Sequence, residues 1–255
     1  MNISPESVAA LFVVALVAGW VDAIAGGGGM ITVPSLLAVG LPPAAAIATN
    51  KLQGSFGALT AALYFLRRGA VSLNESYRSA IAVCAGSVLG GWAVTRIDAA
   101  QLALLVPVLL IFIGAYFLFF AGRLDERREP LMSQRRFDGT AAPALGFYDG
   151  FFGPGTGSFM AMAFVALRGL PIRSATAQAK LLNFVSNLSA LVYFVFFGQI
   201  FWLVGVAMIG GQMIGAYLGA RTALKDGAKT IRPIIIIVSF IMCGREVWKI
   251  ISNHM

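Results

Sequence analysis

The stretch GGGGMITVP, from Gly26 to Pro34, decides the fold of this chain. Four consecutive glycines form a poor helix, and a glycine run lets the backbone point bare N–H groups toward a ligand. The run lies inside an apolar segment. At membrane depth, free backbone groups are tolerated only where protein buries them or where they line a cavity. The sequence therefore predicts a membrane helix that is broken at Gly26, Gly27, Gly28 and Gly29, with the break forming a cavity wall.

The same plan occurs a second time in the chain. GFYDGFFGPGTGS (146–158) repeats GWVDAIAGGGGMI (19–31), so that Asp149 stands 127 residues after Asp22. At an offset of 129 residues, GLPIRSATAQAKL (169–181) faces GLPPAAAIATNKL (40–52), and Lys180 matches Lys51. Such a register predicts an internal duplication. We expect a first transmembrane repeat (1–122), a linker (123–139) and a second transmembrane repeat (140–255).

Composition places the chain among helical membrane proteins. The 255 residues are 58% hydrophobic and 12% charged, whereas a soluble domain carries about a quarter charged residues. The net charge of +8 indicates cytoplasmic loops rich in Lys and Arg, not a nucleic-acid partner. The one histidine, His254, is next to last, so we expect no His-based metal site or catalytic triad, no cofactor and no enzymatic activity.

Each predicted repeat contains one apolar segment that is too short to cross a membrane. The apolar segments are 7–25, 30–41, 44–66, 79–94 and 99–121 in the first repeat, and 140–152, 156–167, 174–197, 201–220 and 231–251 in the second. As helices, 30–41 and 156–167 would be about 18 Å long, against a hydrocarbon core of about 30 Å. They are predicted to be re-entrant or half helices. If each break makes a hairpin whose ends return to one side, three transmembrane helices follow it and the repeats are inverted.

The distribution of cationic loop residues favours inversion. Inverted repeats place 14 Lys and Arg residues on one side, namely Arg67, Arg68, Arg78, the five linker arginines, Arg168, Arg173, Arg221, Lys225, Lys229 and Arg232. The other side keeps 3, which are Arg96, Arg245 and Lys249. If each long first segment instead spans and its short partner dips back, the division becomes 10 against 7. Because cytoplasmic loops are rich in Lys and Arg, we expect a cytoplasmic linker and periplasmic N- and C-termini.

Matched polar residues inside the apolar segments suggest a site for an anion. Lys51 and Lys180 each lie seven residues beyond a helix start, about 10 Å deep, and we expect each to be approached by the glycine break of its own repeat. Half-helix N-termini at Met30 and at 156–158 would supply further N–H donors. The predicted substrate-binding residues are Gly26, Gly27, Gly28, Gly29, Asn50, Lys51, Gln53, Gly153, Gly155, Thr156, Gly157, Ser158, Lys180, Asn183 and Asn187.

Structural roles remain open for several of these residues. A membrane lysine can be held by an ion pair with Asp22 or Asp149, or can snorkel to the surface. The aspartates can cap the half helices, pair with the lysines or transfer protons. Glycines elsewhere most simply permit close helix packing, as we expect for Gly86, Gly90, Gly211 and Gly215.

The paired motifs resemble those of a known family. GGGGMITVP with TNKL in the first half, and GFYDGFFGPGTGS with AKLLN in the second, are similar to the TauE/SafE sulfite exporter family, also called the toluene sulfonate uptake permease family. The resemblance covers about 8–251. It implies a bacterial inner-membrane permease for small sulfur-containing anions, organosulfonates or related organic acids. The second break reads GPGTG in place of four glycines, so the two halves need not bind equally.

We therefore predict a secondary transporter for a small anion, working by alternating access in contact with membrane lipid. No GxxxxGK[ST] string occurs, so transport would draw on an ion gradient or on the substrate gradient. One alternative is an anion channel. The other is an intramembrane aspartyl protease that uses Asp22 and Asp149, although no GxGD string occurs. The substrate, the direction of transport and a homo-oligomeric state remain open.

Overall fold

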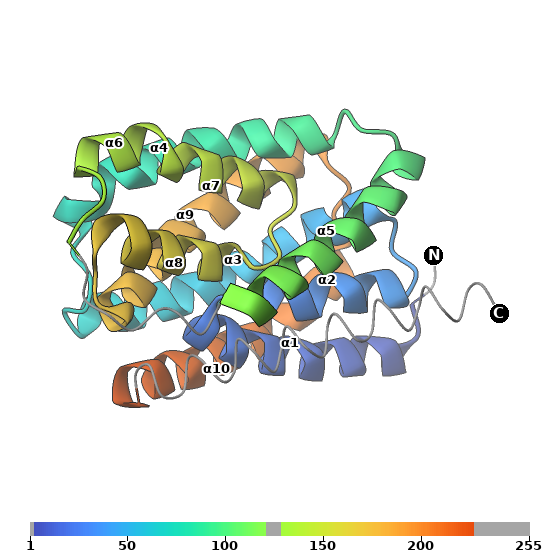
Figure 1. Cartoon of the computed structure of the whole chain (residues 1–255). Coiled ribbons are helices and arrows are strands. Elements are labelled where there is room, and N and C mark those ends of the chain that lie inside the picture. Colours follow the sequence, from blue (N-terminus) through green and yellow to red (C-terminus); the bar gives the residue numbers. More distant parts are fainter. Residues whose placement is uncertain (1–2, 121–128, 227–255) are drawn as a thin grey trace.

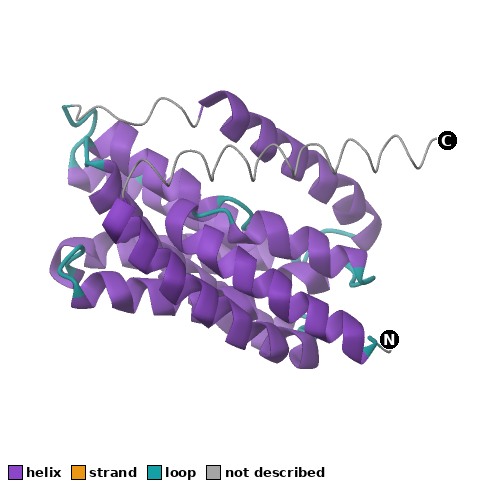
Figure 2. Ribbon diagram, turned by 90° about the horizontal axis from the view of Figure 1, so that it is seen from below, coloured by secondary structure: helices purple, strands orange, loops and turns teal. Residues whose placement is uncertain are grey.

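The computed structural model of the chain describes residues 3–120 and 129–226, and every regular element in these ranges is a helix (Figure 1). In chain order they are α1 (Pro5–Ala25), α2 (Gly28–Ala38), α3 (Pro43–Arg67), α4 (Leu73–Val94), α5 (Ala99–Phe120), α6 (Gln134–Gly139), α7 (Ala141–Phe151), α8 (Thr156–Arg168), α9 (Ile172–Phe197) and α10 (Trp202–Asp226). Figure 2 shows these helices side by side, with most connecting loops at the two ends of the bundle. The predicted segment 231–251 lies outside the described residues.

The helices agree with an all-helical membrane protein. Three of the described helices are long and apolar enough to cross a membrane, Pro5–Ala25, Ile172–Phe197 and Trp202–Lys225. The two short apolar segments predicted after the breaks are also present, as Gly28–Ala38 and Thr156–Arg168. In Figure 1 the connection between α7 and α8 lies midway along the bundle, where a broken membrane helix would place it.

The first glycine break is shorter than the sequence predicts. Gly26 ends α1 in a left-handed conformation (φ 79°), and α2 already begins at Gly28. The carboxylate of Asp22 accepts a hydrogen bond from the Gly28 N–H at 3.1 Å and so fixes the start of α2. The expected half-helix start at Met30 is therefore wrong by two residues, because a distant side chain caps the helix earlier.

The predicted linker contains an ordered helix. α6 begins after Ser133, whose hydroxyl accepts the Arg136 N–H at 3.4 Å. Phe137 is fully buried and its ring stacks on Phe164 of α8 at a centroid distance of 4.8 Å. The end of the predicted linker therefore lies against the bundle, because one aromatic side chain anchors α6 there.

The helices pack in a reciprocal arrangement between the two halves of the chain. α1 packs along α10, α7 packs along α4, and α3 contacts α9. Gly211 and Gly215 bring α10 against Phe12 and Leu16 of α1. The matched pair on α4 does the same for α7, since a Cβ on Gly86 or Gly90 would collide with the backbone of Pro143 or Phe147. The prediction that these four glycines serve helix packing is confirmed.

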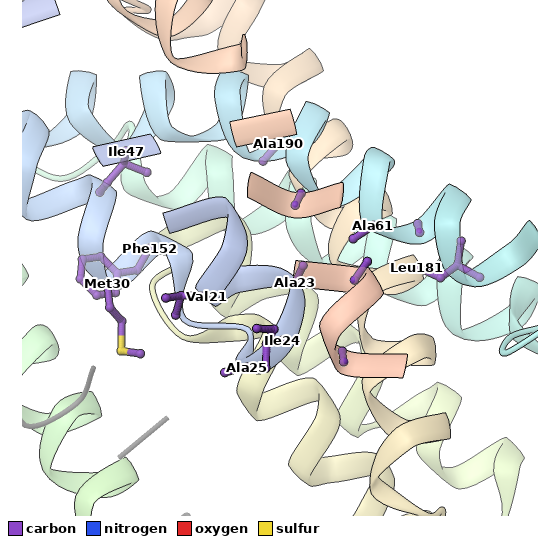
Figure 3. Packing of buried hydrophobic residues seen from close by; sticks show 14 of the residues in the cluster. Val21, Ala23, Ile24, Ala25, Met30, Ile47, Ala61, Phe152, Leu181 and Ala190 are labelled. Carbon is purple, nitrogen blue, oxygen red and sulfur yellow. The ribbon is translucent and has the colours of Figure 1, made fainter. Parts of the chain in front are cut away.

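The main hydrophobic core lies around the glycine breaks and draws side chains from both halves (Figure 3). Met30 and Ile47 come from the first half, and Phe152, Leu181 and Ala190 come from the second. All five are at most 5% exposed. This apolar packing surrounds the polar groups at the centre of the bundle.

Candidate functional site

Two buried ion pairs connect the halves of the chain. Lys51 Nζ lies 2.8 Å from Asp149 Oδ1, and Lys180 Nζ lies 2.8 Å from Asp22 Oδ2. The lysine side chains are 0% and 1% exposed. Each lysine therefore takes its acidic partner from the opposite half. The expectation that each lysine meets the break of its own repeat is wrong for Lys51, which lies beside Gly153, because α3 packs against α9 of the other half.

Each aspartate also binds a second group. Asp22 Oδ1 accepts the Gly28 N–H at 3.1 Å while Oδ2 contacts the lysine. Asp149 Oδ2 accepts a hydrogen bond from the Ser186 hydroxyl at 2.5 Å while Oδ1 contacts Lys51. Of the open roles for the aspartates, pairing with a lysine applies to both, and capping a half helix applies to Asp22. Both carboxylates are held by two partners, which fixes their orientation.

The two glycine breaks touch each other. The Ser158 hydroxyl donates to the Ala25 carbonyl. A Cβ on Gly157 would lie 2.7 Å from the Gly26 Cα and 2.8 Å from Lys180 Nζ. Gly153 adopts a φ of 98°, a conformation that side chains other than glycine rarely take. Close approach of the two breaks thus requires glycine at position 157, and the backbone conformation favours glycine at position 153.

A small polar cavity lies between the breaks. Its volume is about 20 Å³, and it is lined by Asp22, Gly26, Gly29, Asn50, Gln53, Gly54, Asp149, Gly153, Asn183, Asn187 and Gln212. A cavity of this size has room for about one water molecule. An oxyanion with four or more heavy atoms does not fit into a cavity of this volume.

The carboxamides around the cavity form two local networks. Asn50 Oδ1 accepts from Thr32 Oγ1 at 2.5 Å and from Gln53 Nε2 at 2.7 Å. Asn187 Nδ2 donates to the carbonyl of Asn183 at 2.8 Å and to its Oδ1. These bonds fix the carboxamides on α3 and α9 around the ion pairs.

Two carboxamide oxygens remain without a hydrogen-bond partner among the described residues. They are Gln53 Oε1 and Gln212 Oε1, and both are buried. Buried polar atoms are normally paired, so an unpaired acceptor facing a cavity indicates a place for a donor from a ligand or from water. The cavity therefore offers acceptors as well as the donors that the sequence predicts.

The structure brings most of the predicted site residues together. Seven of them line the central cavity, namely Gly26, Gly29, Asn50, Gln53, Gly153, Asn183 and Asn187. Gly157, Ser158 and Lys180 line an adjoining space of about 10 Å³ together with Gly26 and Thr176. The side chain of Thr156 instead donates to the Gly153 carbonyl at 2.7 Å. Gly27, Gly28 and Gly155 line neither space, and neither does Lys51, which reaches the central cavity only through its partner Asp149.

Sequence reasoning missed Gln212, Thr32 and Ser186 as site residues. Gln212 carries the clearest signal, because it is the only charged or carboxamide residue in the apolar segment 201–220. Ser186 lies three residues after Asn183, on the polar face of the same helix. Thr32 has no comparable signal, since a helical threonine usually bonds its own backbone.

The geometry gives no support to the protease alternative. Aspartyl proteases place two carboxylates together so that they share one proton. Asp22 and Asp149 are instead each paired with a separate lysine at 2.8 Å. The two acids are therefore components of two ion pairs and not of a carboxylate dyad.

Comparisons with known proteins agree on one family. The profile of the sulfite exporter TauE/SafE family matches residues 11–245. A "probable membrane transporter protein" of Haemophilus influenzae is 47% identical over 248 residues, covering 97% of each chain. The "probable membrane transporter protein YfcA" of Escherichia coli K12 is 44% identical over 243 residues, covering 95% of this chain and 90% of that protein.

A more distant relative is the "probable membrane transporter protein YunE" of Bacillus subtilis, at 28% identity over 253 residues, with 89% of this chain covered and 93% of that protein. No solved structure matches the chain. The relatives are named as membrane transporters and not as enzymes. The resemblance inferred from the two glycine motifs is thus confirmed over most of the sequence, and the chain belongs to the sulfite exporter TauE/SafE family.

Proposed function

We propose that this chain is a secondary transporter for a small anion, working by alternating access between two inverted repeats. The observation that carries the proposal is the pair of buried Lys–Asp contacts that join the two halves across a small polar cavity. A transporter needs a central site whose contacts differ between its conformations. Ion pairs between the two halves at the cavity are contacts that would break and form again as the repeats move.

The lysines are already arranged to hold an anionic oxygen. Asp149 and Asp22 each place a carboxylate oxygen 2.8 Å from an ammonium group. When the repeats separate, each lysine loses that partner, and an unpaired buried charge is costly by about 3–5 kcal/mol. A substrate carboxylate, sulfite or sulfonate that takes the place of an aspartate would offset this cost. Substrate binding and opening of the cavity would thereby be coupled.

The directions of equivalent helices support inversion of the repeats. In Figure 1, α1 and α3 run away from the end of the bundle that carries the label N, whereas α7 and α9 run toward that end. The reciprocal packing of α1 on α10 and of α7 on α4 fits a two-fold relation between the halves. Together with the excess of Lys and Arg, this arrangement favours an inner-membrane protein with a cytoplasmic linker and periplasmic termini.

The substrate class follows from charge and from the family. Two buried ammonium groups and the positive ends of the helices that begin at Gly28 and Thr156 favour an oxyanion over a neutral solute. The family is named for sulfite export. We therefore place sulfite and small organosulfonates first, and small organic acids second, as candidate substrates.

The test is transport by purified protein in phosphatidylcholine vesicles. Labelled sulfite, thiosulfate, a small sulfonate and acetate would be offered in turn, with protein-free vesicles as background. A transporter gives saturable uptake that is accelerated when unlabelled substrate is loaded inside. Uptake that rises linearly with concentration and shows no such exchange would contradict alternating access and favour the channel alternative.

A further inference from the structure

A second, larger cavity lies at the end of the bundle where α3 ends and α9 begins. Its volume is about 530 Å³, and four cationic side chains line it, Arg68 directly after α3, Arg173 on α9, and Arg221 and Lys225 on α10. Tyr64 and Ser174 add hydroxyl groups, and none of the lining residues is acidic. Charges of one sign around a cleft concentrate counter-ions within it.

The opposite end of the bundle differs in chemistry. The cavity found there, at the start of α10, has a volume of about 300 Å³ and is lined by apolar side chains that include Ile200, Phe201 and Trp202. Cations at the cytoplasmic surface are expected from the charge rule alone. That rule does not explain why three arginines and one lysine converge on a single cavity.

A polar stripe on α9 leads from this cationic cavity to the centre of the molecule. Arg173, Thr176, Lys180, Asn183 and Asn187 follow one another at spacings of three and four residues, which places them on one helix face. Arg173 lines the cationic cavity, Thr176 and Lys180 line the small intermediate space, and both asparagines line the central cavity.

Thr176 lies between the cationic cavity and the central cavity. Its side chain is buried, and its hydroxyl has no hydrogen-bond partner among the described residues. Three other helical threonines donate to the carbonyl four residues earlier, namely Thr32 to Gly28, Thr60 to Phe56 and Thr222 to Leu218. An unused hydroxyl next to Lys180 is therefore available to an anion that passes along α9.

The stripe belongs to the second half of the chain alone. At the repeat offset of 129 residues, the matching positions on α3 are Ala44, Ile47, Lys51, Gly54 and Ala58, so only the lysine is polar. The asymmetry gives the two ends of the bundle different access to the central site.

We propose that the cationic cavity is an oxyanion-binding vestibule that supplies the central site along the α9 stripe. The proposal rests on the proposed transport function and adds a second binding site to it. Arginine binds oxyanions through two parallel N–H donors, and exposed arginines leave the anion partly hydrated, so the vestibule binds weakly and exchanges rapidly. The same chemistry would also bind a phospholipid headgroup, and the experiment separates the two sources.

The central experiment compares the variant R173Q/R221Q with R67Q/R135Q. Both variants lose two positive charges, but Arg67 and Arg135 are exposed and do not line the cavity. Sulfite uptake into phosphatidylcholine vesicles would be measured over a range of concentrations at low and high salt. We expect R173Q/R221Q to raise KM about tenfold, with the maximal rate within about twofold of wild type, and to lose most of the salt dependence of KM. R67Q/R135Q should match wild type, and equal KM values in the two variants would overturn the vestibule.

Two further experiments test the polar stripe on α9 and the binding of a lipid headgroup in the cationic cavity. T176V keeps the shape of the side chain and removes its hydroxyl, so we expect a lower maximal rate with an unchanged KM; wild-type kinetics would exclude a role for Thr176. Vesicles containing one part phosphatidylglycerol to two parts phosphatidylcholine form the lipid arm. A difference between wild type and R173Q/R221Q that occurs only in these vesicles would identify a lipid headgroup site and overturn the substrate vestibule.

Binding of sulfite to purified protein separates this proposal from the proposed function. The variant K180M/D22N removes a central ion pair without a net change of charge, and we expect weak sulfite binding to persist in it and to disappear in R173Q/R221Q. If that binding is found but no vesicle uptake is, the transport function fails and the anion site stands. If uptake is saturable but R173Q/R221Q behaves as wild type in both assays, the vestibule fails and the transport function stands.

Discussion

At the scale of single residues, the two lysines form buried ion pairs between the halves of the chain. Lys51 and Lys180 are buried and each is paired with an aspartate of the opposite half. Replacing one partner of a buried pair leaves an uncompensated charge, whereas replacing both partners by neutral residues of similar size is often tolerated. The crossed pairing therefore specifies which double variants restore stability.

The first prediction concerns the stability of these variants. K51M should lower the free energy of unfolding by about 3–5 kcal/mol, because it leaves the Asp149 carboxylate buried without its lysine. The double variant K51M/D149N should recover most of this loss, and K51M/D22N should not. The measurement is the thermal unfolding of detergent-purified protein, in which the folded protein that remains after heating is quantified by size-exclusion chromatography. Equal stability of the two double variants would contradict the crossed pairs.

A second prediction uses the same variants to ask whether the lysines bind substrate. We expect K51M/D149N and K180M/D22N to be folded and to have lost the central, tight component of anion binding, because the ammonium group provides the charge that the substrate needs on leaving water. The control is D149N alone, which keeps Lys51. Tight anion binding in both charge-neutral double variants would show that the lysines only stabilise the fold.

At the scale of helices, the two glycine breaks pack directly against each other. Gly157 at the start of α8 lies against Gly26 at the end of α1 and next to the ammonium group of Lys180. A side chain here meets backbone atoms, which cannot move aside as the end of a flexible side chain can. Because both residues are glycines, no side chain holds the backbones of the two breaks apart.

The third prediction is that Gly157→Ala destabilises the protein and impairs transport. The added Cβ would lie 2.7 Å from the Gly26 Cα, and overpacking of this kind costs about 1–3 kcal/mol. Gly139→Ala is the matched control, since its Cβ meets nothing within 4 Å, and we expect a change within about 0.5 kcal/mol. Thermal unfolding and sulfite uptake per folded protein would be compared. Wild-type behaviour of Gly157→Ala would show that the breaks are not in tight contact.

Much of this helical architecture could be predicted from the sequence, for physical reasons that also set the limits. Glycine runs and matched lysines in apolar segments are local signals, and they located both breaks and most residues around the cavity. The start of α2 depends on a hydrogen bond from the Gly28 N–H to Asp22, which the sequence offered only as one of several roles for that aspartate. The internal repeat shows which residues are equivalent, but not that Lys51 pairs across to Asp149, because that depends on how α3 packs against α9.

At the scale of the whole molecule, the end of the linker lies at the same end of the bundle as the cationic cavity. The chain segment before α6 is joined to the end of α8 by a hydrogen bond from the Met132 N–H to the Leu167 carbonyl at 3.1 Å. Arg168 adds a bond from Nη1 to the carbonyl of Met132 at 2.5 Å. The linker end and the α8–α9 connection therefore lie on the same side, which is the side of the cationic cavity lined by Arg173.

The last prediction tests inversion with two equivalent prolines. Pro42 and Pro171 precede α3 and α9, match at the repeat offset of 129, and are both exposed. In a background with Cys84 and Cys243 replaced by alanine, Pro42→Cys and Pro171→Cys would be labelled with a membrane-impermeant maleimide in intact cells whose outer membrane admits the reagent. Inverted repeats place these positions on opposite sides of the membrane. We expect Pro42→Cys to react in intact cells and Pro171→Cys to react only after the inner membrane is opened.

Arg135→Cys in the linker provides the internal reference, because the charge distribution predicts that it lies in the cytoplasm together with Pro171. Parallel repeats would make Pro42→Cys and Pro171→Cys react under the same conditions. That result would remove alternating access by inverted repeats as the mechanism, although the crossed ion pairs would remain. Reaction of Arg135→Cys and Pro171→Cys in intact cells, with Pro42→Cys protected, would keep the inversion but reverse its orientation, and the cationic vestibule would then open to the periplasm.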